Sequence, residues 1–256
     1  MISNFFEILL LSIIQGVSEF LPISSAAHLS LASNIYEFKN QSLLIYISLH
    51  LGSLLAILFY FRNEIFNLNN NLNLFYKIIV ATIPLVIIGY FLYYTGIIYE
   101  LINNKKVIVW TTFFGAILLH IADRRKIFNN LENSFNFKSA LIIGFFQVIA
   151  LIPGVSRAGI TITAGRILGF DRTDSTKISF YLSIPALAGA SALGIKDLLN
   201  ENIEFSFIAL IGILLSFIFS LITIKYFLKF IKKFSFKAFV LYRIILSLIL
   251  LYIIYF

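Results

Sequence analysis

Residues 15–28 read QGVSEFLPISSAAH and place a carboxylate, a proline, serines and a histidine inside an otherwise apolar segment. Pro22 removes a backbone donor and opposes the continuation of a helix. An ionisable side chain such as that of Glu19 is costly in lipid and usually faces a cavity or a partner. The stretch therefore predicts a broken membrane helix whose interruption carries chemistry.

The rest of the chain has the composition of a membrane protein. Of its 256 residues 60% are hydrophobic and 12% are charged, and the mean hydropathy is +0.94. Soluble domains carry about 25% charged residues, and a helix of about 20 apolar residues spans a bilayer. Six runs have this character, at 42–61, 75–94, 107–122, 178–195, 206–224 and 238–256. We expect one all-α integral membrane domain over 1–256, with about six full transmembrane helices.

A second interruption resembles the first. Residues 147–161 read QVIALIPGVSRAGIT, with a proline at 153. The regions 3–34 and 138–170 are therefore each predicted to form a re-entrant broken-helix hairpin. Aligning the two prolines also pairs Ser25 with Ser156, and three candidate spans follow each hairpin.

Loop charge orients the two halves relative to each other. With the N-terminus outside, the predicted inside loops hold 13 Lys and Arg, and the outside segments hold four. The inside loops are 62–77, 123–138, 171–177 and 225–237; the outside segments are 1–4, 36–41, 95–106 and 196–204. This asymmetry favours that orientation. The repeats, approximately 1–125 and 130–256, would then be inverted, with their sites where the broken helices meet.

Several other classes of protein are disfavoured. The net charge of +8 is explained by inside loops and needs no nucleic-acid partner. The chain has no cysteine, which excludes disulfides and thiolate chemistry. No basic region precedes the first apolar run, so we expect the first helix to be retained rather than cleaved. The sequence leaves the oligomeric state open, a homodimer included.

Gln15 and Glu19 are candidate ligands of a hard cation. They are four residues apart and share one face of a helix. An amide and a carboxylate can hold a divalent cation through oxygen, with water completing the shell. The alternative is that Glu19 pairs with Arg157 and joins the two half-helices.

The stretch PGVSRAGIT at 153–161 predicts a phosphate cradle. Gly154 helps to break the first half-helix, and Ser156 is a candidate N-cap of the next one. A helix start offers free N–H groups and a positive dipole end. Arg157 adds a planar charged fork, and Thr161 places a hydroxyl on the same face.

His28 and its neighbours complete the candidate chemistry. A histidine can exchange protons near neutral pH, and Ser24 and Ser25 are the nearest hydroxyls. His50 is interpreted as an interhelical residue or as part of the same cavity. We expect Arg243, which follows a lysine-rich loop, to extend to the membrane surface.

These residues resemble the two signature regions of the bacterial undecaprenyl-diphosphate phosphatases, the bacitracin-resistance family. The likeness covers nearly the whole chain and includes SIPALAGA at 183–190. It implies hydrolysis of undecaprenyl diphosphate to undecaprenyl phosphate, which recycles the lipid carrier of peptidoglycan synthesis. It also implies dependence on Mg²⁺ or Ca²⁺, and a site in the inner membrane that opens to the extracytoplasmic side.

Functional residues follow by position from this resemblance. The family's acidic pair falls on Gln15 and Glu19, and its serine and histidine fall on Ser25 and His28. Its second motif falls on Pro153, Gly154, Ser156, Arg157 and Thr161. The catalytic prediction is thus Glu19, Ser25, His28 and Arg157; substrate binding is assigned to Gly154, Ser156, Arg157 and Thr161; the metal is assigned to Glu19 and Gln15. Relatives often have Glu at position 15, and the motif's second serine is Ala158 here.

Two other functions compete with this interpretation. Inverted repeats with broken helices are also a transporter architecture, so a lipid-phosphate or ion transporter is the alternative. A type-2 phosphatidic-acid phosphatase would need a histidine shortly after its Ser-Arg motif. No histidine follows Arg157 in this chain, so that class is excluded.

Overall fold

The computed structural model describes residues 2–25, 27–29, 32, 43–66, 68–200 and 206–255. These residues form helices and contain no strand, only an isolated bridge between Asn129 and Phe170. The helices are α1 (Ile2–Ser18), α3 (Leu43–Tyr60), α4 (Arg62–Phe66), α5 (Leu68–Tyr94), α6 (Ile97–Asn103), α7 (Lys105–Asp123), α8 (Leu131–Ser134), α9 (Phe137–Val148), α10 (Arg157–Ile167), α11 (Arg172–Asn200), α12 (Phe207–Ile231) and α13 (Lys237–Tyr255).

The prediction of six full spans is confirmed. In the described residues six helices are long and apolar enough to cross a membrane, namely α3, α5 from Leu72, α7, α11, α12 and α13 to Ile254. The span predicted at 178–195 is longer in the structure, because α11 runs from Arg172 to Asn200. The chain is therefore a multi-pass membrane protein. The predicted loop at 36–41 lies outside the described residues, as do 33–34 in the second arm of the first hairpin.

Both predicted helix breaks are present. Helix α1 ends at Ser18, and residues 19–23 form turns around Pro22. Helix α9 ends at Val148 and continues as one 3₁₀ turn, Ile149–Leu151, before the loop that contains Pro153. Helix α10 then begins after Ser156. Phe20, which is fully buried, packs edge-on against Phe180 of α11 at 5.5 Å between ring centroids and anchors the first break in the core.

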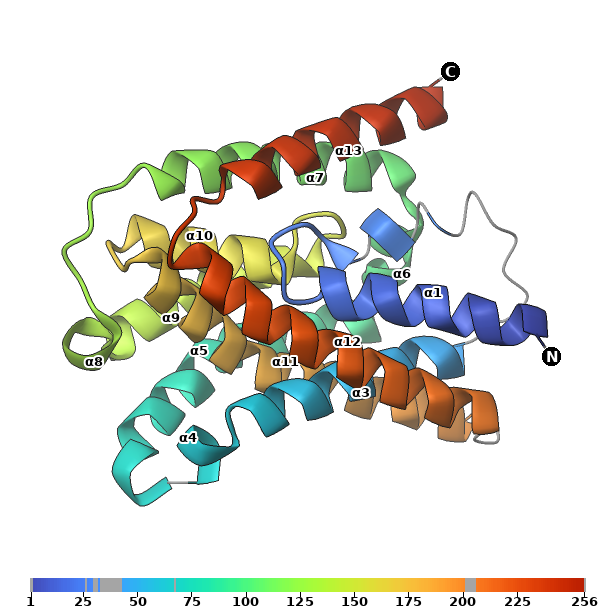
Figure 1. The fold of residues 1–256 in the computed structure, drawn as a ribbon, viewed down its shortest axis with the longest axis horizontal. Coiled ribbons are helices and arrows are strands. Elements are labelled where there is room, and N and C mark those ends of the chain that lie inside the picture. The colour runs from blue at the N-terminus through green and yellow to red at the C-terminus, as the bar shows by residue number, and fades with distance from the viewer. Residues whose placement is uncertain are drawn as a thin grey trace.

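The helices pack in pairs taken from both halves of the sequence. Helix α1 packs on α12 and α9 on α5, while α13 lies along α7 and α11 contacts α3. Helix α10 packs between α7, α9 and α11. Figure 1 shows α13 beside α7 at one side of the molecule and α3, α11 and α12 at the other. The two breaks lie between these layers.

Small and hydroxylated residues allow the closest of these contacts. A Cβ added to Gly52 of α3 would collide with the Ile213 carbonyl of α12, so the two backbones touch there. Beside it Ser53 bonds to Ser216 and Ser220 of α12 at 3.2 and 3.0 Å. Small residues and interhelical hydroxyl bonds of this kind hold membrane helices together.

A polar cluster around Asp123 joins four helix ends. Arg172 at the start of α11 donates to both Asp123 carboxylate oxygens, at 2.7 and 3.1 Å. The backbone N–H of Phe236, just before α13, donates to the same carboxylate at 3.3 Å. Arg166 of α10 is 2% exposed and donates to the carbonyls of Asp123 and Arg125. The cluster fixes the loops at this end of the bundle.

Candidate active site

The first half of the site is built at the end of α1. Gln15 and Glu19 lie one turn apart, and the Gln15 amide Nε2 donates to the Glu19 carboxylate at 3.1 Å. Both side chains are buried. The Glu19 N–H donates to the Gln15 carbonyl at 2.9 Å, so the chain keeps helical geometry up to the break. The predicted shared face of these two residues is confirmed.

The second half is built at the start of α10. Ser156 is the N-cap, and its hydroxyl accepts from the Gly159 N–H at 3.1 Å, as predicted. Gly154 has φ of 89°, a conformation that glycine adopts without strain. Arg157 is the first residue of the helix. Its guanidinium is therefore carried at the N-terminal, positive end of the α10 dipole.

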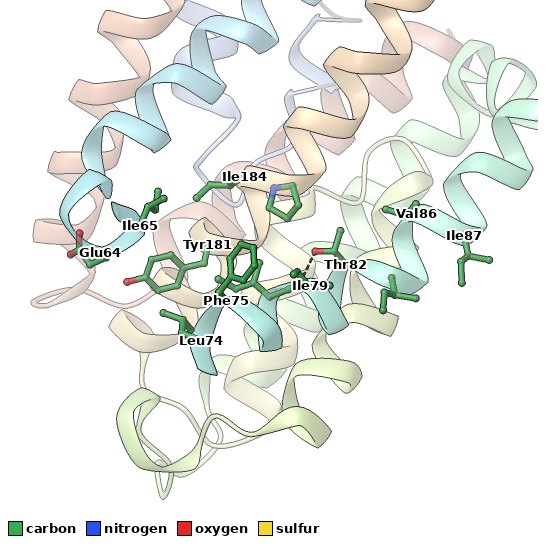
Figure 2. A pocket seen from close by; sticks show the side chains of 13 residues that line it. Glu64, Ile65, Leu74, Phe75, Ile79, Thr82, Val86, Ile87, Tyr181 and Ile184 are labelled. Atoms are coloured by element: carbon green, nitrogen blue, oxygen red, sulfur yellow. Dashed lines mark hydrogen bonds between the residues drawn. The ribbon is translucent and has the colours of Figure 1, made fainter. Parts of the chain in front are cut away.

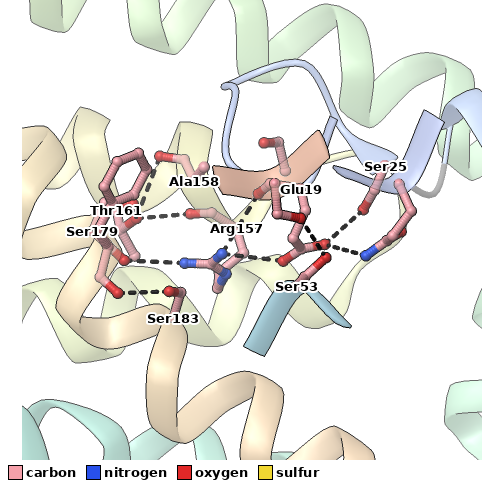
Figure 3. Close-up of polar contacts among 12 residues, drawn as sticks. Glu19, Ser25, Ser53, Arg157, Ala158, Thr161, Ser179 and Ser183 are labelled. Carbon is pink, nitrogen blue, oxygen red and sulfur yellow. Dashed lines mark hydrogen bonds and ion pairs between the residues drawn. The ribbon is translucent and has the colours of Figure 1, made fainter. Parts of the chain in front are cut away.

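The two halves meet through one ion pair. The Arg157 Nη2 lies 3.1 Å from the Glu19 Oε1, and both side chains are largely buried. The Arg157 Nη1 donates to the Ser179 carbonyl of α11 at 3.0 Å. Figure 3 shows the guanidinium between α11 and the Glu19 carboxylate. The two breaks, here called the first and second tips, therefore form one site, although Glu19 and Arg157 are 138 residues apart in the sequence.

Ser25 also contacts this carboxylate. Its hydroxyl donates to the Glu19 Oε2 at 3.3 Å (Figure 3). The group that is placed to accept the Ser25 proton is therefore Glu19.

A polar cavity of about 260 Å³ adjoins the ion pair. The predicted residues Glu19, Ser25, Gly154, Ser156 and Arg157 all line it. Its other walls are largely apolar and come from α5, from the second break and from α11: Leu85, Ala150, Leu151, Ile152, Pro153, Ala186, Leu187 and Ala190. The arrangement is a small, partly open pocket in which charged and hydroxylated side chains lie beside apolar ones.

His28 does not line this cavity. Its Nδ1 is 2.7 Å from the Ser24 carbonyl, and its Nε2 contacts the Tyr242 hydroxyl of α13 at 2.5 Å. The two rings stack at 6° between their planes. The structure thus places His28 beside the first tip and against α13, rather than in contact with Ser25 or Arg157.

Thr161 does not reach the cavity either. Its hydroxyl donates to the Arg157 carbonyl at 2.8 Å and pairs with the Ser179 hydroxyl at 2.7 Å. The side chain is fully buried. Thr161 lies one turn after Arg157 and both side chains contact Ser179 of α11, so the predicted shared face is confirmed, although the Thr161 hydroxyl does not line the cavity. Ala158 is also buried and outside the cavity, so the serine that it replaces would not line the pocket.

Of three further contacts at this site, the sequence leaves one open and does not predict the other two. His50 of α3 lines the cavity, as one of its two interpretations allowed, with Nδ1 2.8 Å from the Tyr46 carbonyl. The Ser179 carbonyl orients Arg157. Arg243 is fully buried and donates to backbone carbonyls. The expectation that Arg243 extends to the surface is wrong, because the non-helical breaks offer acceptors inside the bundle.

The residues present fit a divalent cation only as a partial shell. No group of three or more His, Cys, Asp or Glu side chains gathers in the described part of the chain. The Gln15 Oε1 is buried and accepts no hydrogen bond among the described residues, beside the Glu19 carboxylate. These two oxygen donors suit Mg²⁺ or Ca²⁺ if water and a phosphate group supply the remaining ligands.

Comparison with known proteins places the chain among membrane enzymes of one kind. A family model described as bacitracin resistance protein BacA matches residues 8–249. The undecaprenyl-diphosphatase of Pelagibacter ubique is 54% identical over 255 residues, which is 100% of both chains. That of Alteromonas mediterranea is 39% identical over 98% of each chain, and the undecaprenyl-diphosphatase 2 of Stutzerimonas stutzeri is 37% identical over 96% of each.

Proposed function

The chain belongs to the bacitracin resistance protein BacA family, and on this premise we infer that it is an undecaprenyl-diphosphate phosphatase. It hydrolyses undecaprenyl diphosphate to undecaprenyl phosphate and inorganic phosphate, and so regenerates a lipid carrier for cell-wall synthesis. The observation that carries this function is the meeting of Glu19, Ser25 and Arg157, from two distant breaks, in one small polar cavity.

The cavity suits the head group of this substrate. We propose that the diphosphate lies against the Arg157 guanidinium and the N-terminus of α10, where Ser156 and Gly154 form the wall. A planar guanidinium and free N–H groups at a helix start both favour phosphate oxygens. Phosphoryl transfer depends mainly on such positioning and charge stabilisation.

Glu19 is the proposed proton acceptor. Attack on the terminal phosphorus breaks the P–O bond to the bridging oxygen, and undecaprenyl phosphate leaves. The nucleophile is either water or the Ser25 hydroxyl, whose proton Glu19 is placed to accept. If Ser25 attacks, water then releases phosphate from the seryl ester.

A divalent cation, Mg²⁺ or Ca²⁺, is proposed to act with these residues. Glu19 and the free Gln15 Oε1 would hold it. Its chemistry would be to neutralise charge on the phosphate oxygens.

The apolar tail of the substrate also has a matching surface. A groove of about 520 Å³ runs between α5 and α11 (Figure 2). Its lining includes Val86 and Pro185, whose sequence neighbours Leu85 and Ala186 line the polar cavity. We propose that the first part of the tail leaves the cavity along this groove.

The membrane and orientation are proposed from loop charge. Thirteen Lys and Arg in the predicted inside loops against four outside support a cytoplasmic-membrane protein with its N-terminus outside. The outward opening of the cavity is proposed from the family to which the chain belongs, and loop charge does not decide it. The chain has no cysteine, so Asn104→Cys and Arg125→Cys can each be labelled alone with an impermeant maleimide. Labelling of intact cells at 104 but not at 125 supports this orientation, and the reverse pattern contradicts it.

The function is tested by phosphate release from undecaprenyl diphosphate by the purified protein in detergent. We expect release by the wild type and its loss in Arg157→Ala and Glu19→Ala. Lys229→Ala, which removes an exposed charge away from the cavity, is the matched control and should retain release. No release from folded wild type would contradict the phosphatase and make lipid transport the next assay. Phosphate release that persists in EDTA would contradict only the proposed role of the divalent cation, and the phosphatase activity would stand. Light scattering on the same sample determines whether the protein is a homodimer.

A further inference from the structure

Arg243 of α13 is the largest fully buried side chain among the described residues, with 0% exposure. None of the ion pairs found in the described part of the chain includes it. A guanidinium within a membrane helix is costly, so its charge must be balanced by other polar groups. Here those groups are backbone carbonyls.

Three of these carbonyls come from the two breaks, and a fourth, that of Thr111 in α7, accepts from the Arg243 Nη2 at 3.5 Å. The Arg243 Nη2 donates to the Gly154 and Val155 carbonyls, at 3.1 and 3.0 Å. Its Nη1 donates to the Pro22 carbonyl at 3.5 Å. These three carbonyls lie in non-helical turns and bends, outside any helical hydrogen-bond ladder, and the Gly154 carbonyl also accepts from the Thr112 hydroxyl of α7 at 3.2 Å. One side chain outside the cavity thus bridges the first tip to the second.

The bridged carbonyls stand just before two strained residues. Ser24 has φ of 74° and Ser156 has φ of 70°, and no other non-glycine residue in the described chain has positive φ. Such backbone persists where its surroundings hold it in place. Arg243 constrains this backbone by binding the Pro22 carbonyl, two residues before Ser24, and the Val155 carbonyl, one residue before Ser156.

Two glycines make room for the guanidinium. A Cβ on Gly115 of α7 would collide with the Arg243 Nη2. A Cβ on Gly159 of α10 would stand 2.9 Å from its Nη1. The neighbouring helices are therefore shaped around this charge.

We propose that Arg243 is a positioning residue of the reaction. By binding the carbonyls of both tips, it fixes Ser25 and Arg157 in their relation to Glu19. This inference rests on the proposed phosphatase activity and adds a residue outside the cavity that determines its geometry.

The test compares kcat and KM for undecaprenyl diphosphate in four single variants. Arg243→Met removes the bridge, Arg243→Lys keeps the charge on one ammonium, and Gly115→Ala displaces the guanidinium without removing it. The matched control is Gly189→Ala, because nothing lies within 4 Å of a Cβ there. A small misplacement of reacting groups can cost about 100-fold in rate. We expect that order of loss in kcat for Arg243→Met, smaller losses for Arg243→Lys and Gly115→Ala, a nearly unchanged KM, and wild-type values for Gly189→Ala.

A double variant separates positioning from general damage. Because Gly115 acts by making room for Arg243, adding Gly115→Ala to Arg243→Met should change kcat by no more than about twofold, a non-additive result. Wild-type kcat in folded Arg243→Met or Gly115→Ala, or fully additive losses in the double variant, would overturn the inference alone. If Arg243→Met is not recovered folded, Gly115→Ala and Arg243→Lys decide. Failure of the wild type to release phosphate would instead overturn the activity on which the inference rests.

Discussion

Ser24 and Ser156 hold the same unusual conformation at the two helix breaks. Each has a positive φ, and each hydroxyl accepts from the N–H three residues on, of Ala27 at 3.4 Å and of Gly159 at 3.1 Å. The same sequence interval separates Gln15 from Gln147, and both of these amides are fully buried. The alignment of Pro22 with Pro153 is therefore off by one residue, because Ser24 and not Ser25 corresponds to Ser156. This relationship supports the proposed internal repeat.

The Ser156 cap should contribute measurably to stability. Replacing a serine N-cap with alanine costs about 1 kcal/mol, and replacing it with glycine costs only a few tenths. Glycine also relieves the positive φ. We therefore expect Ser156→Ala to be less stable than Ser156→Gly, as measured by reversible unfolding in mixed micelles. Equal stabilities would contradict the cap and strain described here.

Ser25 distinguishes two chemical routes. If its hydroxyl is the nucleophile, Ser25→Ala should lose more than about 100-fold in kcat, as expected when a reacting group is removed. If water is the nucleophile, the variant should retain most of its turnover. Two measurements decide between the routes. One is phosphate release by Ser25→Ala, and the other is a search for a phosphoseryl species in rapidly quenched wild-type protein.

Two substitutions distinguish a positioning role of the His28 ring from a role in proton transfer. The Nδ1 hydrogen bond to the Ser24 carbonyl holds the first tip, and an asparagine side chain can donate to the same carbonyl. We expect His28→Asn to keep kcat within about tenfold of wild type and His28→Ala to lose more than that. Equal, severe losses in both variants would show instead that the imidazole transfers a proton.

Asp123 should matter for folding and not for chemistry. Its carboxylate accepts from Arg172 and lies 3.7 Å from the buried Arg166 Nε. Removing one partner of a buried ion pair costs about 3–5 kcal/mol, although Arg172, whose side chain is 36% exposed, contributes the smaller part. Asp123→Ala should therefore lower the unfolding midpoint and leave kcat of the folded fraction unchanged. The comparison is with a control variant that is destabilised to the same extent. A lower kcat in folded Asp123→Ala than in that control would contradict a purely structural role for Asp123.

Much of the architecture could be predicted from local patterns. Apolar runs of membrane length located the six spans, and Pro22 and Pro153 located the two breaks. Gln15 and Glu19 were placed on one face because helical spacing dictates it. These features depend on residues close together in the sequence, so one chain suffices to predict them.

Features that depend on distant partners could not be predicted in this way. Arg243 follows a lysine-rich loop, and nothing nearby in the sequence indicates that its guanidinium donates hydrogen bonds to the Pro22 and Val155 carbonyls. Thr161 has the right spacing from Arg157, but its hydroxyl pairs with the Ser179 hydroxyl of α11 and does not line the cavity. His28 turns toward Tyr242, which is 214 residues away. In each case a tertiary acceptor outweighed the local pattern.

The bridge made by Arg243 also sets an order of events during biosynthesis. The Pro22 carbonyl leaves the ribosome early, while the guanidinium that binds it lies 221 residues later, in the last span. Until α13 is inserted, the turns at both breaks have no such donor to hold them. A nascent chain that stops before α13 therefore lacks the side chain that bridges the two breaks, so the proposed catalytic geometry forms only after α13 has been inserted.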